Sequence, residues 1–214
     1  MIGTGVYHLS EVARYTGVPN ATLRSWFKPR SDGRGAGPIF ESEYGPIGED
    51  FAISFLNLIE VYVARFFKKE GVKPPIIRRA HEVLQADLHS DFPFAHADLS
   101  TDGVRIIRET KDQDLIDAIS KQHFFKQMKL TRVHYSDVTR LATRWEIARG
   151  VLIDPQLNYG KPVVENSGVS TLVVARQYRA NHKDAALVAR LFRLTESSVL
   201  NAYQFERGLG RVAA

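Results

Sequence analysis

Between Leu9 and Lys28, apolar residues recur at helical spacing and are interrupted once by small, turn-forming residues. The pattern predicts two short helices that separate at Gly17, where the chain can adopt positive φ, and before Pro19, which a helix interior does not tolerate. Ser10 is expected to cap the first helix and Asn20 the second, because such side chains accept hydrogen bonds from the free N–H groups of a first turn. The positions expected to face inward are Val12, Ala13, Thr16, Leu23, Trp26 and Phe27.

A stretch rich in Gly, Ser and Pro follows at Pro29–Pro46 and predicts an exposed loop. Within it, Pro38–Phe40 is a candidate short strand. A second extended piece near Phe51–Ile53 could pair with that strand. Such a pair would form a wing beside the two helices.

Two longer amphipathic helices are expected after the wing. Ser54 is placed to cap the first, which extends to about Glu70, and Pro74 or Pro75 opens the second, which extends to about His89. Their apolar residues recur every three or four positions, as on one buried face of a helix.

After Pro93 the apolar period changes from helical to alternating. Phe94–Leu99 and Val104–Arg108 flank Asp102-Gly103, a dipeptide typical of tight turns, so the pattern predicts a β-hairpin. Further elements are expected as helices at Gln113–Lys121 and Ser136–Ile147 and an extended piece at Met128–His134.

The last part of the chain predicts two short strands followed by three helices. Val151–Ile153 and Val163–Val164 are the strand candidates. The helices are expected near Thr171–Ala180, Asp184–Phe192 and Thr195–Arg207. The pattern as a whole predicts a mainly α fold with small β elements.

Charge changes the picture only locally, because a net charge of +5 on 214 residues is mildly basic. Basic residues outnumber acidic ones five to two in Met1–Phe40 and seven to two in Lys121–Gly150. The absence of cysteine excludes disulfides, thiolate catalysis and cysteine-bound zinc, and it fits a cytoplasmic protein. No apolar run is long enough to span a bilayer, since the longest, Ile53–Phe67, contains Asn57, Glu60 and Arg65.

The first helix pair is the sharpest functional signal. On its second helix, the residues expected to point outward are donors and acceptors suited to phosphates and base edges: Asn20, Thr22, Arg24, Ser25 and Lys28. Arg30 and Arg34 in the loop that follows would contact the DNA backbone. A plain helical hairpin without a ligand is the alternative. We expect double-stranded DNA as the partner, bound by a homodimer, because a dimer reads a palindrome.

A second helix-turn-helix pattern occupies Leu187–Phe205. Its packing positions are suitable, although Arg193 stands where glycine is usual. The outward residues carry no positive charge and include an acid, namely Glu196, Ser197, Ser198, Asn201 and Gln204. Since a carboxylate repels phosphate, this pair is expected to bind protein or to dimerise rather than to read DNA.

Catalytic and metal-binding patterns are weak. The seven histidines are scattered, and none stands at ligand spacing to a carboxylate partner. Asp112, Asp114 and Asp117 could hold Mg²⁺ in a nuclease, but they lie at an expected helix start, where the helix dipole already favours acids. We therefore expect a non-enzymatic protein without metal or cofactor.

Several stretches resemble known families in the order found there. Tyr7–Ala13, continuing through Trp26, resembles the start of MerR-type winged helix-turn-helix domains. Ile53–Glu60, with Gly71-Val72 and Ile77–Ala80, resembles the continuation found in one class of VapB-type antitoxins. The C-terminal part resembles the domain-of-unknown-function family 433 at Ile153–Pro155, Tyr159–Val164, Thr171 and Ala202–Glu206.

The resemblance implies an antitoxin encoded beside a PIN-like ribonuclease toxin, which it would neutralise while repressing its own operon. It divides the chain into a MerR-like DNA-binding region at 1–90, a hairpin and connecting helix at 91–135, and a C-terminal antitoxin-family domain at 136–214. The alternatives are a stand-alone MerR-like regulator and a protein-interaction module without a toxin partner.

Overall fold

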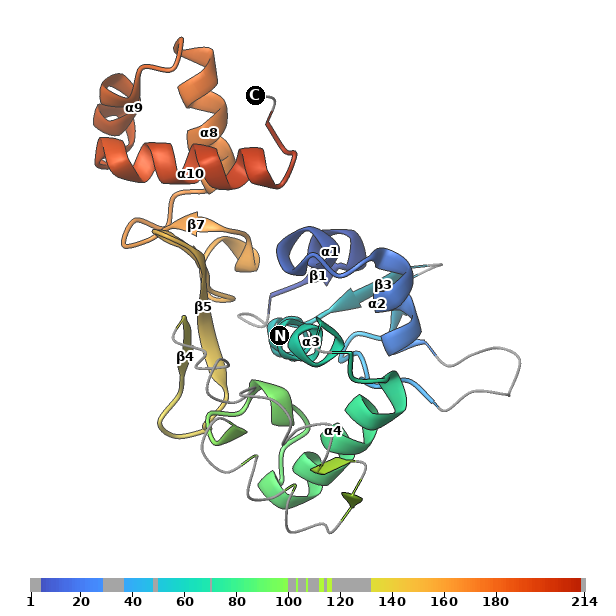
Figure 1. The fold of residues 1–214 in the computed structure, drawn as a ribbon. Coiled ribbons are helices and arrows are strands. Elements are labelled where there is room, and N and C mark those ends of the chain that lie inside the picture. Colours follow the sequence, from blue (N-terminus) through green and yellow to red (C-terminus); the bar gives the residue numbers. More distant parts are fainter. Residues whose placement is uncertain are drawn as a thin grey trace. The chain divides into compact units, whose positions relative to one another are not determined.

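The computed structural model describes residues 5–28, 37–47, 50–69, 71–99 and 132–212, together with 103, 107, 112, 113, 115 and 116 (Figure 1). The chain divides into two compact units: an N-terminal unit, residues 6–142, and a C-terminal unit, residues 143–214 with 1–5. The described part combines helices with two small antiparallel sheets, so the expected helices and small β elements are both present in a mixed fold. None of the described helices is both long and apolar enough to cross a bilayer.

The N-terminal unit opens with β1 (Tyr7–His8) and two short helices, α1 (Leu9–Thr16) and α2 (Asn20–Phe27), so the expected helix pair is confirmed. Gly17 ends α1 with φ of 70°, and its N–H donates to the carbonyl of Ala13 at 2.8 Å. Both predicted caps are wrong because each helix begins earlier. Glu11 caps the start of α1 by accepting the N–H of His8 at 3.3 Å, and Pro19 precedes Asn20, the first residue of α2.

A three-stranded sheet follows the helix pair in the order β1-β3-β2, formed with β2 (Pro46–Ile47) and β3 (Asp50–Ile53). β3 pairs antiparallel with β1 and with β2. The predicted strand at Pro38–Phe40 is wrong. The N–H groups of Ile39 and Phe40 instead donate to the carbonyl of Trp26, at 2.8 and 3.0 Å, which buries both side chains at the end of α2.

The two longer helices are α3 (Phe55–Lys69) and α4 (Pro74–Leu88), close to the predicted bounds. Ser54 caps α3 as expected, since its hydroxyl accepts the N–H of Asn57 at 3.2 Å. Between the helices, buried Glu60 lies 2.8 Å from Nε2 of His81. Burial raises the pKa of the Glu60 carboxyl, and the neighbouring imidazole opposes that shift. The pair therefore ties α3 to α4 inside an aromatic core.

The hairpin predicted after Pro93 is wrong. Pro93–Ala95 forms a 3-10 turn, η1, and Gly103 and Ile107 are helical. The apolar residues in this stretch serve burial rather than a sheet face, since Phe94 and Leu99 are fully buried. The helix predicted at Gln113–Lys121 is present at 113, 115 and 116, and its remainder lies outside the described residues.

A strand replaces the helix predicted at Ser136–Ile147. After β4 (Val133–Tyr135), which overlaps the end of the extended piece predicted at Met128–His134, the chain forms β5 (Ala142–Ala148). β5 pairs antiparallel with β6 (Val151–Ile153) across the turn Arg149-Gly150. Gly150 has φ of 68°, which permits the tight turn between the two strands. The turn holds Ala142–Ala148 in an extended conformation beside β6, although the composition of this segment also suits a helix.

The expected small strand pair of the C-terminal unit is confirmed, since β6 pairs antiparallel with β7 (Val163–Val164). A 3-10 turn, η2 (Asn158–Gly160), lies between the two strands. The three helices also match the prediction within two residues: α8 (Thr171–Ala180), α9 (Ala185–Phe192) and α10 (Glu196–Gly208).

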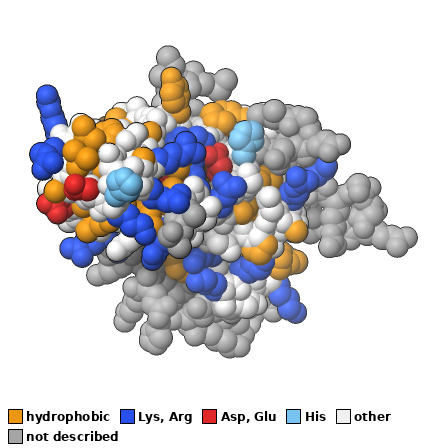
Figure 2. Space-filling model, turned by 90° about the horizontal axis from the view of Figure 1, so that it is seen from above, with side chains coloured by type: hydrophobic (Ala, Val, Ile, Leu, Met, Phe, Trp, Pro, Cys, Tyr) orange, Lys and Arg blue, Asp and Glu red, His pale blue; other side chains and the backbone are white. Residues whose placement is uncertain are grey.

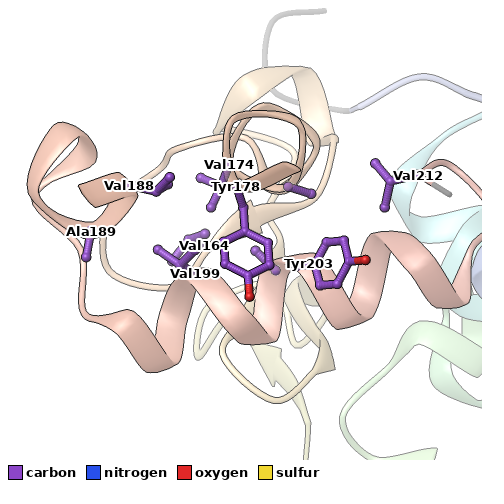
Figure 3. Packing of buried hydrophobic residues seen from close by; sticks show 10 residues of the cluster. Val164, Val174, Tyr178, Val188, Ala189, Val199, Tyr203 and Val212 are labelled. Atoms are coloured by element: carbon purple, nitrogen blue, oxygen red, sulfur yellow. The ribbon is translucent and has the colours of Figure 1, made fainter. Parts of the chain in front are cut away.

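The core of the C-terminal unit is built from small and branched residues between these helices (Figure 3). Val188 of α9 lies beside Val174 of α8 and Val199 of α10, and Ala189 belongs to the same cluster. One polar link is buried with them. Glu206, with no exposed surface, accepts the hydroxyl of Thr171 and lies 3.5 Å from Nε of Arg211.

Candidate nucleic-acid interface

The second helix of the N-terminal pair separates its apolar and polar residues cleanly. Leu23, Trp26 and Phe27 are buried, with at most 4% of their surface exposed. The polar residues on the other side are exposed, except Thr22, which is half-buried: Asn20, Thr22, Arg24, Ser25 and Lys28. Asn20, Thr22, Arg24 and Ser25 therefore lie on the side of α2 away from the core, and the exposed Lys28 follows the helix as its extended C-cap.

That face rests on a rigid base. Trp26 packs edge-on against Phe40, with ring centroids 6.0 Å apart, and Phe27 packs against the same ring at 5.5 Å. Gly17 and the buried Val18 fix the turn between the helices. Because α2 cannot rotate without losing these contacts, its polar side is held in a fixed orientation relative to the core of the unit.

Lys68, in the last turn of α3, joins this face, although it was not among the residues predicted from the sequence. Its Nζ donates to Oγ1 of Thr22 at 2.9 Å, and Lys68 is exposed. Ser25 donates to the carbonyl of Thr22 at 2.7 Å. The only signal in the sequence is a pair of lysines at the end of a long helix, and 46 residues separate Lys68 from Thr22.

Arg30 and Arg34, predicted to contact the DNA backbone, lie outside the described residues. Arg14 of α1 is exposed and adds a further cation beside the turn. The described basic groups of the helix pair are therefore Arg14, Arg24 and Lys28, with Lys68 from α3.

In the second helix pair, α9 and α10, the outer residues of α10 lie opposite another part of the same unit. Ser197, Leu200, Asn201 and Gln204 of α10 line a groove of about 550 Å³. The opposite wall comes from Glu146, Arg149, Gly150 and Glu165, around the β5–β6 turn and after β7. A Cβ on Gly150 would lie 3.3 Å from Nδ2 of Asn201. The face of α10 that would have to enter a DNA groove thus looks onto a β-turn.

Asp112, one of the three aspartates that could form a magnesium site, has a structural role. Asp112 accepts the N–H of Leu115 at 3.2 Å and forms an ion pair with Nε of Arg79 at 2.6 Å. Asp114 and Asp117 lie outside the described residues, and among those described no group of three potential ligands could hold a metal ion. Asp112 therefore caps a helix and binds a cation of the protein itself.

The fold and its surfaces define a two-unit, mainly helical protein with a candidate nucleic-acid interface on α2. The chain is 28% identical over 203 residues to a Mycobacterium tuberculosis protein named "Putative antitoxin VapB45", covering 82% of this chain and 83% of that protein. The crystal structure of Rv2018 from Mycobacterium tuberculosis is also similar, with a TM-score of 0.73 and 26% identity over 92% of this chain and 96% of that one. No protein-family model matches, so the MerR-like and family-433 resemblances stay predictions.

Proposed function

We propose that this chain is the antitoxin of a type II toxin-antitoxin system, which represses its own operon by binding operator DNA and neutralises a PIN-like ribonuclease toxin. The observation that carries the proposal is the similarity to a protein named as an antitoxin, which extends over most of both chains. A relationship restricted to one helix pair would support only a general DNA-binding role.

The accessible polar face of α2 supports operator binding. Arg24 is exposed on a helix whose other side is buried, Lys28 follows that helix as its exposed C-cap, and Lys68 adds a cation from α3. Side chains of this type on a short helix suit the major groove, where Arg can donate two hydrogen bonds to guanine. The cations at the edge would contact phosphates.

The test of DNA binding is a gel-shift titration with the segment upstream of the gene. Arg24→Ala should weaken binding by about 1–3 kcal/mol, roughly 5–150-fold, if Arg24 donates to a base edge. Arg176→Ala, an exposed cation on α8 in the other unit, is the matched control and should bind as the parent does. Equal affinity of the Arg24 variant and the parent would exclude Arg24 from base recognition.

Salt dependence tests the same interface independently. Binding should weaken steeply between about 50 and 200 mM salt, because contacts to several phosphates release counterions. Lys68→Met should reduce the slope while keeping the sequence preference. An affinity that does not change with salt would contradict binding through contacts to DNA phosphates.

The toxin part of the proposal is tested by co-expression with the neighbouring reading frame. A PIN-like protein that arrests growth alone, is tolerated together with this chain, and co-purifies with it would support the proposal. Growth arrest that persists with this chain present would contradict it.

A further inference from the structure

The N-terminal unit contains a cavity of about 440 Å³ between α4 and the segment that joins α2 to β2. Four of the residues on its wall carry carboxylates: Glu41, Glu43, Glu82 and Asp91. All four residues are exposed, and their carboxylates form no hydrogen bond or ion pair within the described part of the chain. These oxygens are therefore accessible to a ligand.

The charge of this wall is opposite to that of the protein. Among the described residues of the wall, Arg78 is the one cation, and its Nε already donates to the carbonyl of Pro38 at 3.0 Å. The chain as a whole has a net charge of +5, and Figure 2 shows Lys and Arg side chains outnumbering Asp and Glu on the face seen from above. The cavity is thus an acidic site on a basic protein, and it attracts cations rather than phosphates.

His81 adds a buried polar group to the wall of the cavity. It is 6% exposed, and its Nε2 lies 2.8 Å from Oε1 of the buried Glu60. Phe40 and Phe94 pack edge-on against the imidazole, with ring centroids 5.3 and 5.1 Å away, so the ring is held in place. Within the described residues, Nδ1 of His81 has no hydrogen-bond partner. When Nε2 donates to Glu60, Nδ1 is an acceptor for an N–H group of a ligand.

The spacing of the acids favours an organic cation over a metal ion. Within the described part of the chain, no group of three potential ligands could hold a metal ion. Carboxylates that lie apart instead suit a cation whose N–H groups are spread along a chain. The same wall offers apolar surface for the methylene groups of such a chain, from the buried Ile39 and the half-buried Phe92.

From these observations we propose that the cavity binds an alkyl ammonium or alkyl guanidinium ion. Its charged groups donate to the carboxylates of the wall and to Nδ1 of His81, and its methylene groups contact Ile39 and Phe92. A small free cation such as a polyamine offers this chemistry, and so does an Arg or Lys side chain of a partner protein. The volume of about 440 Å³ is within the range of small-molecule sites.

The test is a calorimetric titration of the full chain without DNA or toxin, so its outcome does not depend on the proposed function. The probes are agmatine, a free alkyl guanidinium with a terminal ammonium, and a capped arginine amide, which carries the guanidinium alone. A dissociation constant on the order of 0.1–1 mM is expected for a cation of about ten non-hydrogen atoms. Tighter binding of agmatine would support a free cation, and equal or tighter binding of the capped arginine would support a partner's side chain. Binding of neither probe up to about 10 mM would overturn the proposal.

A pair of variants on α4 tests whether the acids of the wall recognise the cation. Glu82→Gln removes one charge and keeps the shape of the side chain, so it should weaken agmatine binding about fivefold or more. Asp87→Asn is the matched control, because Asp87 is an exposed acid of the same helix that does not line the cavity. It should bind as the parent does. A Glu82 variant with the affinity of the parent would overturn the proposal.

The histidine resonances distinguish occupation of the cavity from attraction of a cation to surface acids. In ¹⁵N spectra, agmatine should shift the Nδ1 resonance of His81, because this nitrogen accepts an N–H group of the ligand. The resonances of His182, which is exposed in the C-terminal unit, should not change. Binding without a change at His81, or full displacement of agmatine by an equal concentration of Mg²⁺, would indicate a counter-ion at the surface and overturn the proposal.

Discussion

The buried carboxylate of Glu206 gives the most discriminating prediction about stability. One of its oxygens accepts the hydroxyl of Thr171, and that hydroxyl also lies 3.2 Å from the carbonyl of Pro162. The other oxygen makes no hydrogen bond but lies 3.5 Å from Nε of Arg211. The positive charge of Arg211 therefore offsets the cost of burying the Glu206 carboxylate away from solvent.

Replacing Arg211 by Met keeps most of the side-chain volume and removes the charge. Breaking a buried ion pair costs about 3–5 kcal/mol when one partner is deleted. Arg211→Met should lower the free energy of unfolding by less than this, about 2 kcal/mol, because the charged atoms are 3.5 Å apart and 21% of the Arg211 side chain is exposed. For a unit of this size, that lowers the midpoint of thermal unfolding by roughly 8–16 °C.

The reasoning is tested by a double-mutant cycle. Glu206→Gln retains an oxygen for Thr171 but carries no charge, so Arg211→Met should cost little in that background. The sequence has two tryptophans, one in each unit, and Trp145 of β5 is buried. Urea unfolding followed by fluorescence in a Trp26→Phe background therefore reports on the C-terminal unit alone.

An equal loss of stability from Arg211→Met in both backgrounds would refute the electrostatic argument. It would show that the arginine contributes through packing, because the charge of Glu206 would then make no difference. No loss in either background would likewise remove Arg211 from the list of stabilising residues.

The remaining predictions concern the N-terminal unit. A Glu60 carboxyl with a raised pKa binds its proton more tightly in the folded state, so its contribution is complete below the ordinary value of 4.5 and declines as the pH rises through the raised value. Glu60→Gln should accordingly become more stable relative to the parent between pH 5 and pH 8, measured as the difference in urea midpoints; a constant difference would contradict the assignment. Gly17→Ala should lower stability by about 1 kcal/mol through φ alone, since nothing lies within 4 Å of the added Cβ, and Gly17→Asn, as control, should lower it less.

The sequence predicted an element correctly where a short-range pattern alone decides its structure. Helical spacing and a turn glycine predicted α1 and α2, and the three helices of the C-terminal unit were likewise predicted from the sequence to within a residue. The outward face of α2 followed from the same periodicity, because residues opposite buried positions of a helix are exposed.

The predictions from the sequence were wrong where a hydrogen-bonding partner far along the chain decides the local structure. Ala142–Ala148 has residues that suit a helix, and only pairing with β6 across Arg149-Gly150 makes it a strand. Pro38–Phe40 would be acceptable as a strand, but its backbone is held by the end of α2. In both cases the hydrogen-bonding partner is chosen by tertiary packing, which short-range periodicity does not encode.

Sequence alone therefore determined that this is a mainly helical protein with an accessible polar helix near its N-terminus. Tertiary structure decided which residues join that helix and which faces remain free. Lys68 donates a hydrogen bond from α3 to Thr22 of α2, and the outer residues of α10 face the β5–β6 turn across a groove. Local patterns fix which way a side chain points on its own element, but what stands in front of it depends on contacts between residues far apart in the chain.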